Sequence, residues 1–395
     1  MAEVDKAVQT LQNMWYMAVV NGLGLNKSSF MLLQSGTPLP YETNVLWQVI
    51  DALPPKALTS VMSLGSLSSF YHNYGSLFSP VFAPESDDFK RIMGDQLNSW
   101  QDYQKTLPED VFDDADKEIK AFSMWAKRHL PSHISSSAIS IFSKDILNIV
   151  NASREKYRAN SDFLHPFEGK KGPLYKIKIS DITQGAIAHG PKKEIHLNSK
   201  TSSSDVSSTW AKGGVSGFLS IFSLGGSGNY SNTTRKFVSS DITIDATFQH
   251  VLNVQTFMPG DWYNSGFLNY AFKGKSAWSV GNPLTWESVF GPDGNLQRFI
   301  EGLIIVDGIE IVMKSSAIYS MEDRKEINSQ IKGGIWPFFS TNASGGFNSA
   351  VNFDDQGRMI VKTTCPVGSP AIFGANVGNF PAYITNQNRQ ASTVA

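Results

Sequence analysis

The spacing of apolar residues changes near residues 165–172 of this 395-residue chain, and this change limits the folds that the chain can adopt. Before the change, apolar side chains recur every three or four residues, which is the spacing of helices with one buried face. After it, serine, threonine, glycine and β-branched residues dominate, and short alternating runs appear. The chain is therefore predicted to be α+β, with an all-α helical bundle at residues 1–168 and a β-rich domain at 169–385.

Four stretches before the change carry the helical spacing. In the clearest, residues 87–107, apolar side chains such as Phe89, Met93 and Trp100 recur in this way. The others are residues 4–20, 115–130 and 138–160. Prolines between the stretches favour separate helices, because a proline ring lacks the backbone N–H that a helix interior needs.

Three runs after the change have the composition of strands, and they are residues 241–257, 299–316 and 357–364. Asp307-Gly308 lies between two apolar runs, and this dipeptide is typical of a tight turn between paired strands. We therefore predict a hairpin at Asp307-Gly308, and a second turn at Asp293-Gly294.

Composition narrows the classes of protein that fit the chain. Hydrophobic residues make up 41% and charged residues 17%, which favours a packed core over general disorder. The net charge of −1 argues against nucleic acid as a partner, because phosphate binding needs a basic excess. Cys365 is the only cysteine, so we expect it to be a buried apolar residue rather than part of a disulfide or a thiolate metal cluster.

The two ends of the chain bear on where the protein is made and on which residues lie outside the folded domains. The first residues, MAEVDKAVQTLQNMW, contain acids and amphipathic spacing, unlike a secretory signal peptide. We therefore expect synthesis in the cytoplasm, with later release as a route to action outside the cell. The polar residues 386–395 are expected to form a flexible tail.

A nine-residue pattern, K-G-G-[VI]-x-x-F-[LF]-S, occurs at residues 212–220 and again at 332–340. A glycine- and serine-rich piece follows each copy, and a strand-like run follows that piece. This echo suggests an internal duplication of about residues 175–275 and 299–385. Two related β units would then face each other, as in a sandwich.

The first copy begins a stretch, residues 212–231, in which glycine, serine and bulky apolar residues alternate without charge after the lysine. It is too polar for a transmembrane helix and too rich in glycine for an ordinary core strand. In an extended chain, Phe218 and Phe222 point to one side, and Leu219 and Ile221 to the other. In texture the stretch resembles the segments of β-pore-forming toxins that rest folded before they enter a membrane. An edge strand or a long surface loop of a sandwich is the alternative interpretation.

If the resemblance holds, the bulky apolar residues of the two copies would meet lipid. These candidate membrane-interacting residues are Val215, Phe218, Leu219, Ile221, Phe222, Leu224, Ile335, Trp336, Phe338 and Phe339. Trp262, Tyr263 and Phe267 lie in a stretch rich in aromatic and turn residues, and they are candidates for docking on a sugar or a lipid interface. A loop pinned to the neighbouring domain by aromatic packing is the alternative for these three.

Signals for catalysis or for bound ions are missing from the sequence. It contains no G-x-S-x-G, no HExxH and no glycine fingerprint of a dinucleotide fold. Pro131 separates His129 from His133, so a regular helix cannot present both to one metal. The acidic run at residues 109–118 lacks the spacing of a calcium loop and fits a solvated helix start. We expect no cofactor and no metal.

These observations support three hypotheses about function. The first is a non-enzymatic, membrane-interacting protein of the pore-forming or insecticidal-toxin kind, soluble when made, that assembles with copies of itself on a membrane. The second is a module that binds carbohydrate or a small molecule, or a self-assembling scaffold, so that membrane lipid or a surface glycan is the expected partner. The third is an enzyme whose site, near His189, His196 or His250, is assembled only by folding.

Overall fold

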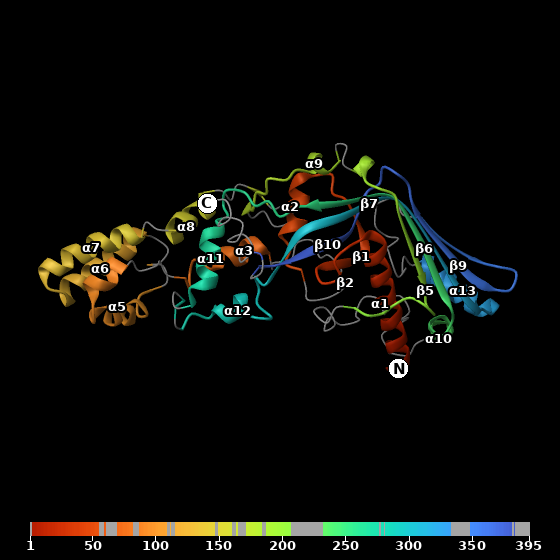
Figure 1. Cartoon of the computed structure of the whole chain (residues 1–395), viewed down its shortest axis with the longest axis horizontal. Helices are drawn as coiled ribbons and strands as arrows, with labels where there is room; N and C mark the ends of the chain where they lie inside the picture. Colours follow the sequence, from red (N-terminus) through yellow and green to blue (C-terminus); the bar gives the residue numbers. More distant parts are fainter. Residues whose placement is uncertain are drawn as a thin grey trace.

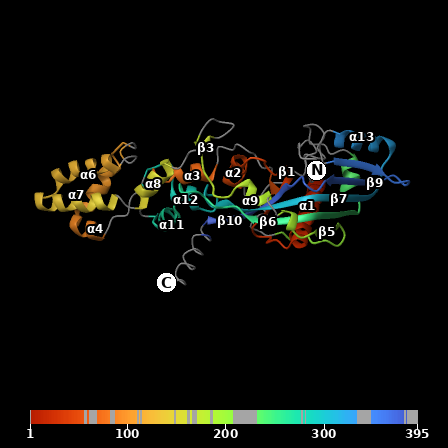
Figure 2. The same ribbon diagram turned by 90° about the horizontal axis from the view of Figure 1, so that it is seen from above.

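The computed structural model describes residues 2–54, 59–60, 69–81, 87–108, 111, 115–146, 149–159, 163–164, 171–183, 187–206, 232–275, 278–279, 281–332, 348–380 and 383. The molecule is elongated, with α6 (Ala115–His129) and α7 (Ser132–Ile146) at one end of the long axis and α13 (Met321–Lys332) near the other (Figure 1). Figure 2 shows the same separation from above. The predicted α+β class is confirmed, with most helices in the N-terminal part and most strands in the C-terminal part.

Eight of the described strands form one sheet, and all of its pairs except β1 with β2 are antiparallel. The strands are β1 (Phe30–Pro38), β2 (Thr59–Ser60), β5 (Lys193–Asn198), β6 (Ile242–Gln255), β7 (Arg298–Ile318), β8 (Asn348–Phe353), β9 (Arg358–Cys365) and β10 (Ala371–Asn379). Outside this sheet, β3 (Phe163–Leu164) pairs with β4 (Lys171–Gly172).

The long strand β7, with 21 residues, runs through the whole sheet beside β6. On its other side, the first half of β7 pairs with β10, and the second half pairs with β9. The sheet therefore has a first half, β2-β1-β10-β7-β6, and a second half, β8-β9-β7-β6-β5. We call the end of the second half, where β7 ends and β6 and β9 begin, the distal end.

The hairpin predicted at Asp307-Gly308 is wrong, because β7 continues through both residues. Gly308 has a φ of +64°, and a Cβ at this position would lie 2.6 Å from Val367 Cγ2. The buried carboxylate of Asp307 accepts hydrogen bonds from the backbone N–H groups of Gly368 (2.9 Å) and Ser369 (3.0 Å), in the turn between β9 and β10. The dipeptide thus marks the place where β7 exchanges one partner strand for another.

The turn predicted at Asp293-Gly294 is confirmed. The backbone N–H of Gly294 donates to the carbonyl of Gly291 over 2.8 Å, which closes a four-residue turn.

The main core joins the sheet to helices from the N-terminal part. The helix α1 (Ala2–Leu23) packs on β5, and its Trp15 and Tyr16 are buried. The Tyr16 hydroxyl donates to the carbonyl of Phe30 over 2.8 Å, which ties α1 to β1. The sequence did not predict β1, because the apolar run at residues 30–33 is short and lacks alternation; it pairs with β10 and is buried.

Several smaller helices complete this part of the fold: α2 (Thr43–Asp51), α3 (Phe70–Ser76), α8 (Ile149–Ala159), α9 (Ile179–Thr183), the 3₁₀ helix η2 (Ile187–His189), α10 (Asn232–Val238), α11 (Ser265–Lys273) and α12 (Trp286–Phe290). These helices share one hydrophobic core with the sheet, and its buried residues come from sequence positions between Leu11 and Phe380.

Four helices form a separate core, and we call them the helical arm: α4 (Asp87–Met93), α5 (Gln96–Gln104), α6 and α7. Trp100, Phe122 and Phe142 are packed at its centre, with the last two ring centroids 4.1 Å apart. The sequence predicted one helix over residues 87–107, but Gly94, with a φ of +49°, separates α4 from α5.

The arm meets the rest of the protein at α8. Arg154 of α8 donates to the carbonyl of Phe78 (2.8 Å) and to Asn151 Oδ1 (3.0 Å). Glu118 of α6 is buried, and this burial raises its pKa to about 7 although the positive charge of Arg154 opposes the shift.

The strands of the two candidate units lie in one sheet rather than in the two facing sheets of the predicted sandwich. The reason is that β6 and β7, which come from the two candidate units, pair directly with each other. The duplication itself stays a prediction.

Candidate functional site

The two lysine-glycine-glycine copies belong to two insertions that leave the sheet at the same end. Residues 199–241 connect β5 to β6, and residues 319–357 connect β7 to β9. Each insertion joins two strands that pair directly and run antiparallel. Because these four strands lie side by side in the order β5-β6-β7-β9, both insertions start and finish at the distal end.

The structure describes the parts of the insertions nearest the sheet. The ten candidate membrane-interacting residues lie in 207–231 and 333–347, which are outside the described residues. The helix α10 directly follows the first of these segments, and α13 directly precedes the second. These two helices contact each other, so the site can be built from them.

The helix α13 begins at a capping box formed by Ser320 and Asp323. The Ser320 hydroxyl accepts a hydrogen bond from the backbone N–H of Asp323 (3.2 Å), and the Asp323 carboxylate accepts one from the backbone N–H of Ser320 (2.9 Å). The sequence signal for this helix start is Ser-Met-Glu-Asp at residues 320–323, and it was not among the predicted features. A capping box satisfies two backbone donors and so fixes where a helix starts.

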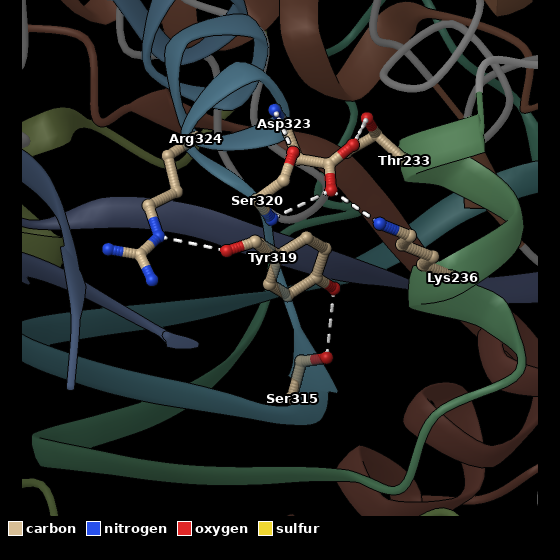
Figure 3. Close-up of polar contacts among 7 residues, drawn as sticks. All are labelled: Thr233, Lys236, Ser315, Tyr319, Ser320, Asp323 and Arg324. Atoms are coloured by element: carbon tan, nitrogen blue, oxygen red, sulfur yellow. Dashed lines mark hydrogen bonds and ion pairs between the residues drawn. The ribbon is translucent and has the colours of Figure 1, made fainter. Parts of the chain in front are cut away.

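The Asp323 carboxylate also joins α13 to α10. Lys236 Nζ of α10 lies 2.5 Å from Asp323 Oδ2, and the Thr233 hydroxyl donates to Asp323 Oδ1 over 3.3 Å (Figure 3). The hydrogen bond from Lys236, together with those from Ser320, lowers the pKa of Asp323 below its usual value even though desolvation acts in the opposite direction. The carboxylate is therefore ionised at neutral pH and accepts from three donors that belong to two insertions.

A second set of contacts attaches α13 to the end of the sheet. Tyr319 is buried, and its hydroxyl lies 2.9 Å from the Ser315 hydroxyl of β7 (Figure 3). The Ser315 hydroxyl in turn lies 2.8 Å from that of Ser240, in the other insertion. One hydroxyl chain thus links β7 to both insertions.

Arg324 connects α13 to the strands β8 and β9. Its Nε donates to the carbonyl of Tyr319 over 3.0 Å, and its guanidinium lies 5.3 Å from the centre of the Phe353 ring. Gly357, with a φ of +82°, leaves room for this guanidinium, since a Cβ there would lie 2.2 Å from an Arg324 nitrogen. Tyr319 and Arg324 are therefore held by residues close to the start of β9.

The three docking candidates lie inside the protein rather than on an open surface. Trp262 and Phe267 are fully buried, and the Trp262 indole N–H donates to the carbonyl of Leu174 over 2.6 Å. Phe267 stacks on Phe78 with ring centroids 4.5 Å apart, and Tyr263 packs against the same core. This arrangement corresponds to the alternative of a loop pinned by aromatic packing.

The three histidines considered for an enzyme lie in three different elements. His196 Nδ1 of β5 pairs with Asp245 on the adjacent strand over 2.6 Å, and both are exposed. His250 Nδ1 lies 3.2 Å from the carbonyl of Gly190, and His189 is in η2. Among the described residues, no group of three or more His, Cys, Asp or Glu could hold a metal ion.

A serine, a histidine and an aspartate do gather near α3, but in an order unsuited to a nucleophile. The Ser69 hydroxyl lies 2.8 Å from His72 Nδ1 and also hydrogen-bonds Asp51, so the hydroxyl is between the other two groups. A serine nucleophile needs the imidazole in that middle position. Asp51 is buried and also accepts from the hydroxyl of Tyr175, which fits a structural role.

Within the described parts of the chain, no helix has both the length and the apolar character to cross a bilayer. Comparison of the chain with protein families, with curated proteins and with solved structures gives no match.

Proposed function

We propose that this chain is a membrane-interacting protein of the pore-forming kind, which assembles with copies of itself on a target membrane. In this proposal the insertions 199–241 and 319–357 open into hairpins that continue the strands of the sheet. The observation that carries the proposal is that both insertions leave the same end of one sheet, each between strands that already pair.

The insertions are long enough for this change. Each contains about 40 residues, so each strand of an extended hairpin would reach about 65 Å at roughly 3.3 Å per residue. This length exceeds the hydrocarbon thickness of a bilayer, about 30 Å. The uncharged segments of alternating apolar and small residues would then occupy the part of each hairpin that meets lipid.

The contact between α10 and α13 is compatible with the change. Ile242 of β6 lies opposite Ser315 of β7, and the same register runs through the pair. Continued beyond the strand ends, this register would put Asp323 opposite residue 234, between its present partners Thr233 and Lys236. The groups that hold the two helices together would thus remain neighbours in paired hairpins.

Assembly from copies is supported by the edges of the second half of the sheet. β5 pairs only with β6, and β8 pairs only with β9, so each leaves one backbone edge without a strand among the described residues. An edge of one copy that pairs with the other edge of the next gives a head-to-tail contact, which can close into a ring.

The experiment compares two engineered disulfides that differ in whether they permit the hairpins to open. Ser349 of β8 lies opposite Thr363 of β9, with their side-chain oxygens 2.9 Å apart. A disulfide in Ser349→Cys/Thr363→Cys holds β8 on β9 and blocks extension of the insertion 319–357. We expect the oxidised variant to release no dye from vesicles, and reduction to restore release.

The matched control joins Asp241 to Ser316, whose backbones already pair, since the N–H of Ser316 donates to the carbonyl of Asp241 over 2.9 Å. The register of β6 and β7 keeps these two residues opposite each other when both strands are extended, so the oxidised Asp241→Cys/Ser316→Cys variant should release dye. Equal release from the oxidised and reduced forms of the first variant would contradict the opening of that insertion. Absence of dye release by the wild-type protein would contradict the pore-forming function.

A further inference from the structure

Two exposed apolar side chains lie at the distal end, where the insertion 319–357 leaves β7. Ile318, the last residue of β7, is 66% exposed, and Met321, the first residue of α13, is 62% exposed. Among the described residues, the other large apolar side chains with comparable exposure are separated along the chain: Tyr41, Met124, Met258 and Val367. Ile318 and Met321 are thus unusual in being close together.

The local structure holds both side chains outward. The register between β7 and β9 shifts between Lys314 and Ile318. Such an irregularity changes the direction in which the following side chains point. Tyr319, between the two exposed residues, is buried and fixed by its hydrogen bond to Ser315. The capping box then sets the start of α13 at Met321, so neither exposed side chain reaches the core without breaking these contacts.

Charged groups of both signs lie at this end, and some of them pair with each other. Lys200 lies 2.8 Å from Asp241, and Arg358 lies 2.7 Å from Asp354. The described residues of the two insertions, 199–206, 232–241, 319–332 and 348–357, contain six basic and seven acidic side chains, so this described part has no basic excess that would select an anionic surface. The distal end therefore presents two apolar side chains surrounded by a nearly neutral set of charged residues.

We infer that Ile318 and Met321 insert into the interface of a zwitterionic lipid membrane and bring the distal end to it before the insertions open. This inference rests on the proposed function, since both insertions leave from this end and must meet the membrane there. Large apolar side chains gain free energy when they leave water, which is the source of the attraction. The contact is separate from the ten apolar residues of the segments 207–231 and 333–347.

The first test places an environment-sensitive dye at each position. Single variants Ile318→Cys and Met321→Cys carry nitrobenzoxadiazole, and Val367→Cys is the control, because Val367 is 61% exposed in the turn between β9 and β10. The wild-type chain treated in the same way is the blank, since Cys365 is buried. With phosphatidylcholine vesicles, emission should rise and shift to shorter wavelength at 318 and 321 but not at 367.

The second test measures binding separately from dye release. Ile318→Ser/Met321→Ser should lower the affinity for phosphatidylcholine vesicles about ten-fold, and Val367→Ser should leave it unchanged. Dye release with no change in emission at 318 and 321 would overturn this inference while leaving the pore-forming function in place. An emission change without dye release would support the contact and count against the pore. Absence of binding to these vesicles, or a double variant that alters only self-association, would also overturn the inference.

Discussion

Two carboxylates, one in the helical arm and one at the distal end, lie near cations of neighbouring helices but have pKa values that shift in opposite directions. Glu118 of α6 has a pKa raised to about 7, because its burial outweighs the charge of Arg154. Asp323 of α13 has a lowered pKa, because Lys236 and Ser320 donate hydrogen bonds to its carboxylate. The two residues have similarly low exposure, 6% and 9%.

The difference shows that depth of burial and hydrogen-bond donors together decide whether a carboxylate keeps its charge, since desolvation is the main cause of the shift at Glu118 and the hydrogen bond from Lys236 is the main cause at Asp323. Arg154 donates hydrogen bonds to Phe78 and Asn151, and its positive charge lowers the pKa of Glu118 by less than burial raises it. Asp323 is covered by the groups that bind it, and its partner Lys236 is 44% exposed. The arm is thus joined to the rest of the protein by a buried contact, that of Glu118 near Arg154. The two insertions are joined to each other by the contact of Asp323 with Lys236, which is open to water on one side.

The largest expected effect concerns Glu118. Its folded pKa is above the unfolded value, so the neutral form stabilises the fold at pH below about 4.5 and this contribution is lost as pH rises through 7. We expect the wild-type free energy of unfolding to fall by about 3 kcal/mol from this group between pH 4.5 and 8. Urea denaturation at a series of pH values should show that Glu118→Gln lacks this decrease.

The matched control is Glu287→Gln, on the surface helix α12, where a hydrogen bond from Lys275 lowers the pKa of the carboxylate. It should keep the wild-type decrease across the same pH range. A decrease in Glu118→Gln as large as in the wild type would show that the arm contact does not depend on this charge.

An intermediate effect is expected at Asp323. Asp323→Ala removes an acceptor for the first turn of α13 and the partner of Lys236, and should lower the free energy of unfolding by about 2 kcal/mol. Asp323→Asn keeps an oxygen for the Ser320 N–H and should cost about half as much. The folded pKa of Asp323 is lowered, so the difference between wild type and Asp323→Asn should be constant from pH 5 to 8 and shrink as pH falls through that lowered value. A difference that already shrinks near pH 6 would contradict the assigned shift.

The smallest effect is expected at Lys236. Its side chain is 44% exposed, so Lys236→Ala should cost less than about 1 kcal/mol, and added salt should reduce the cost. A double-mutant cycle with Asp323→Asn measures the pair directly. A coupling free energy near zero would mean that the capping box, and not the ion pair, is what holds α13.

The sequence predicted the elements whose pattern is local. The amphipathic spacing gave α1 and α6, and the alternating apolar runs gave β6 and β9 close to their observed bounds. Asp307-Gly308 was misread as a hairpin, because a glycine with positive φ serves equally in a tight turn and in a bend of one long strand. Only the partners of β7, which are distant in the chain, decide between the two.

The candidate site was only partly visible in the sequence. The two lysine-glycine-glycine copies drew attention to the insertions, but the contact of Lys236 with Asp323 joins residues that are far apart in the chain. No local sequence pattern predicts that two residues so far apart in the chain lie in contact. The composition of the aromatic stretch that contains Trp262 fits both a binding loop and a packed core. Only the fold shows that Trp262 is buried.

The exchange of partners by β7 at Asp307 and Gly308 also has a mechanical consequence. β10, β1 and β2 reinforce the sheet on one side of this point, and β9 and β8 reinforce it on the other. Only β6 and β7 extend across it as continuous ladders. Fewer of the described strands cross this point than lie on either side of it, so a change of angle at Gly308 would move the far ends of all the strands that carry the insertions.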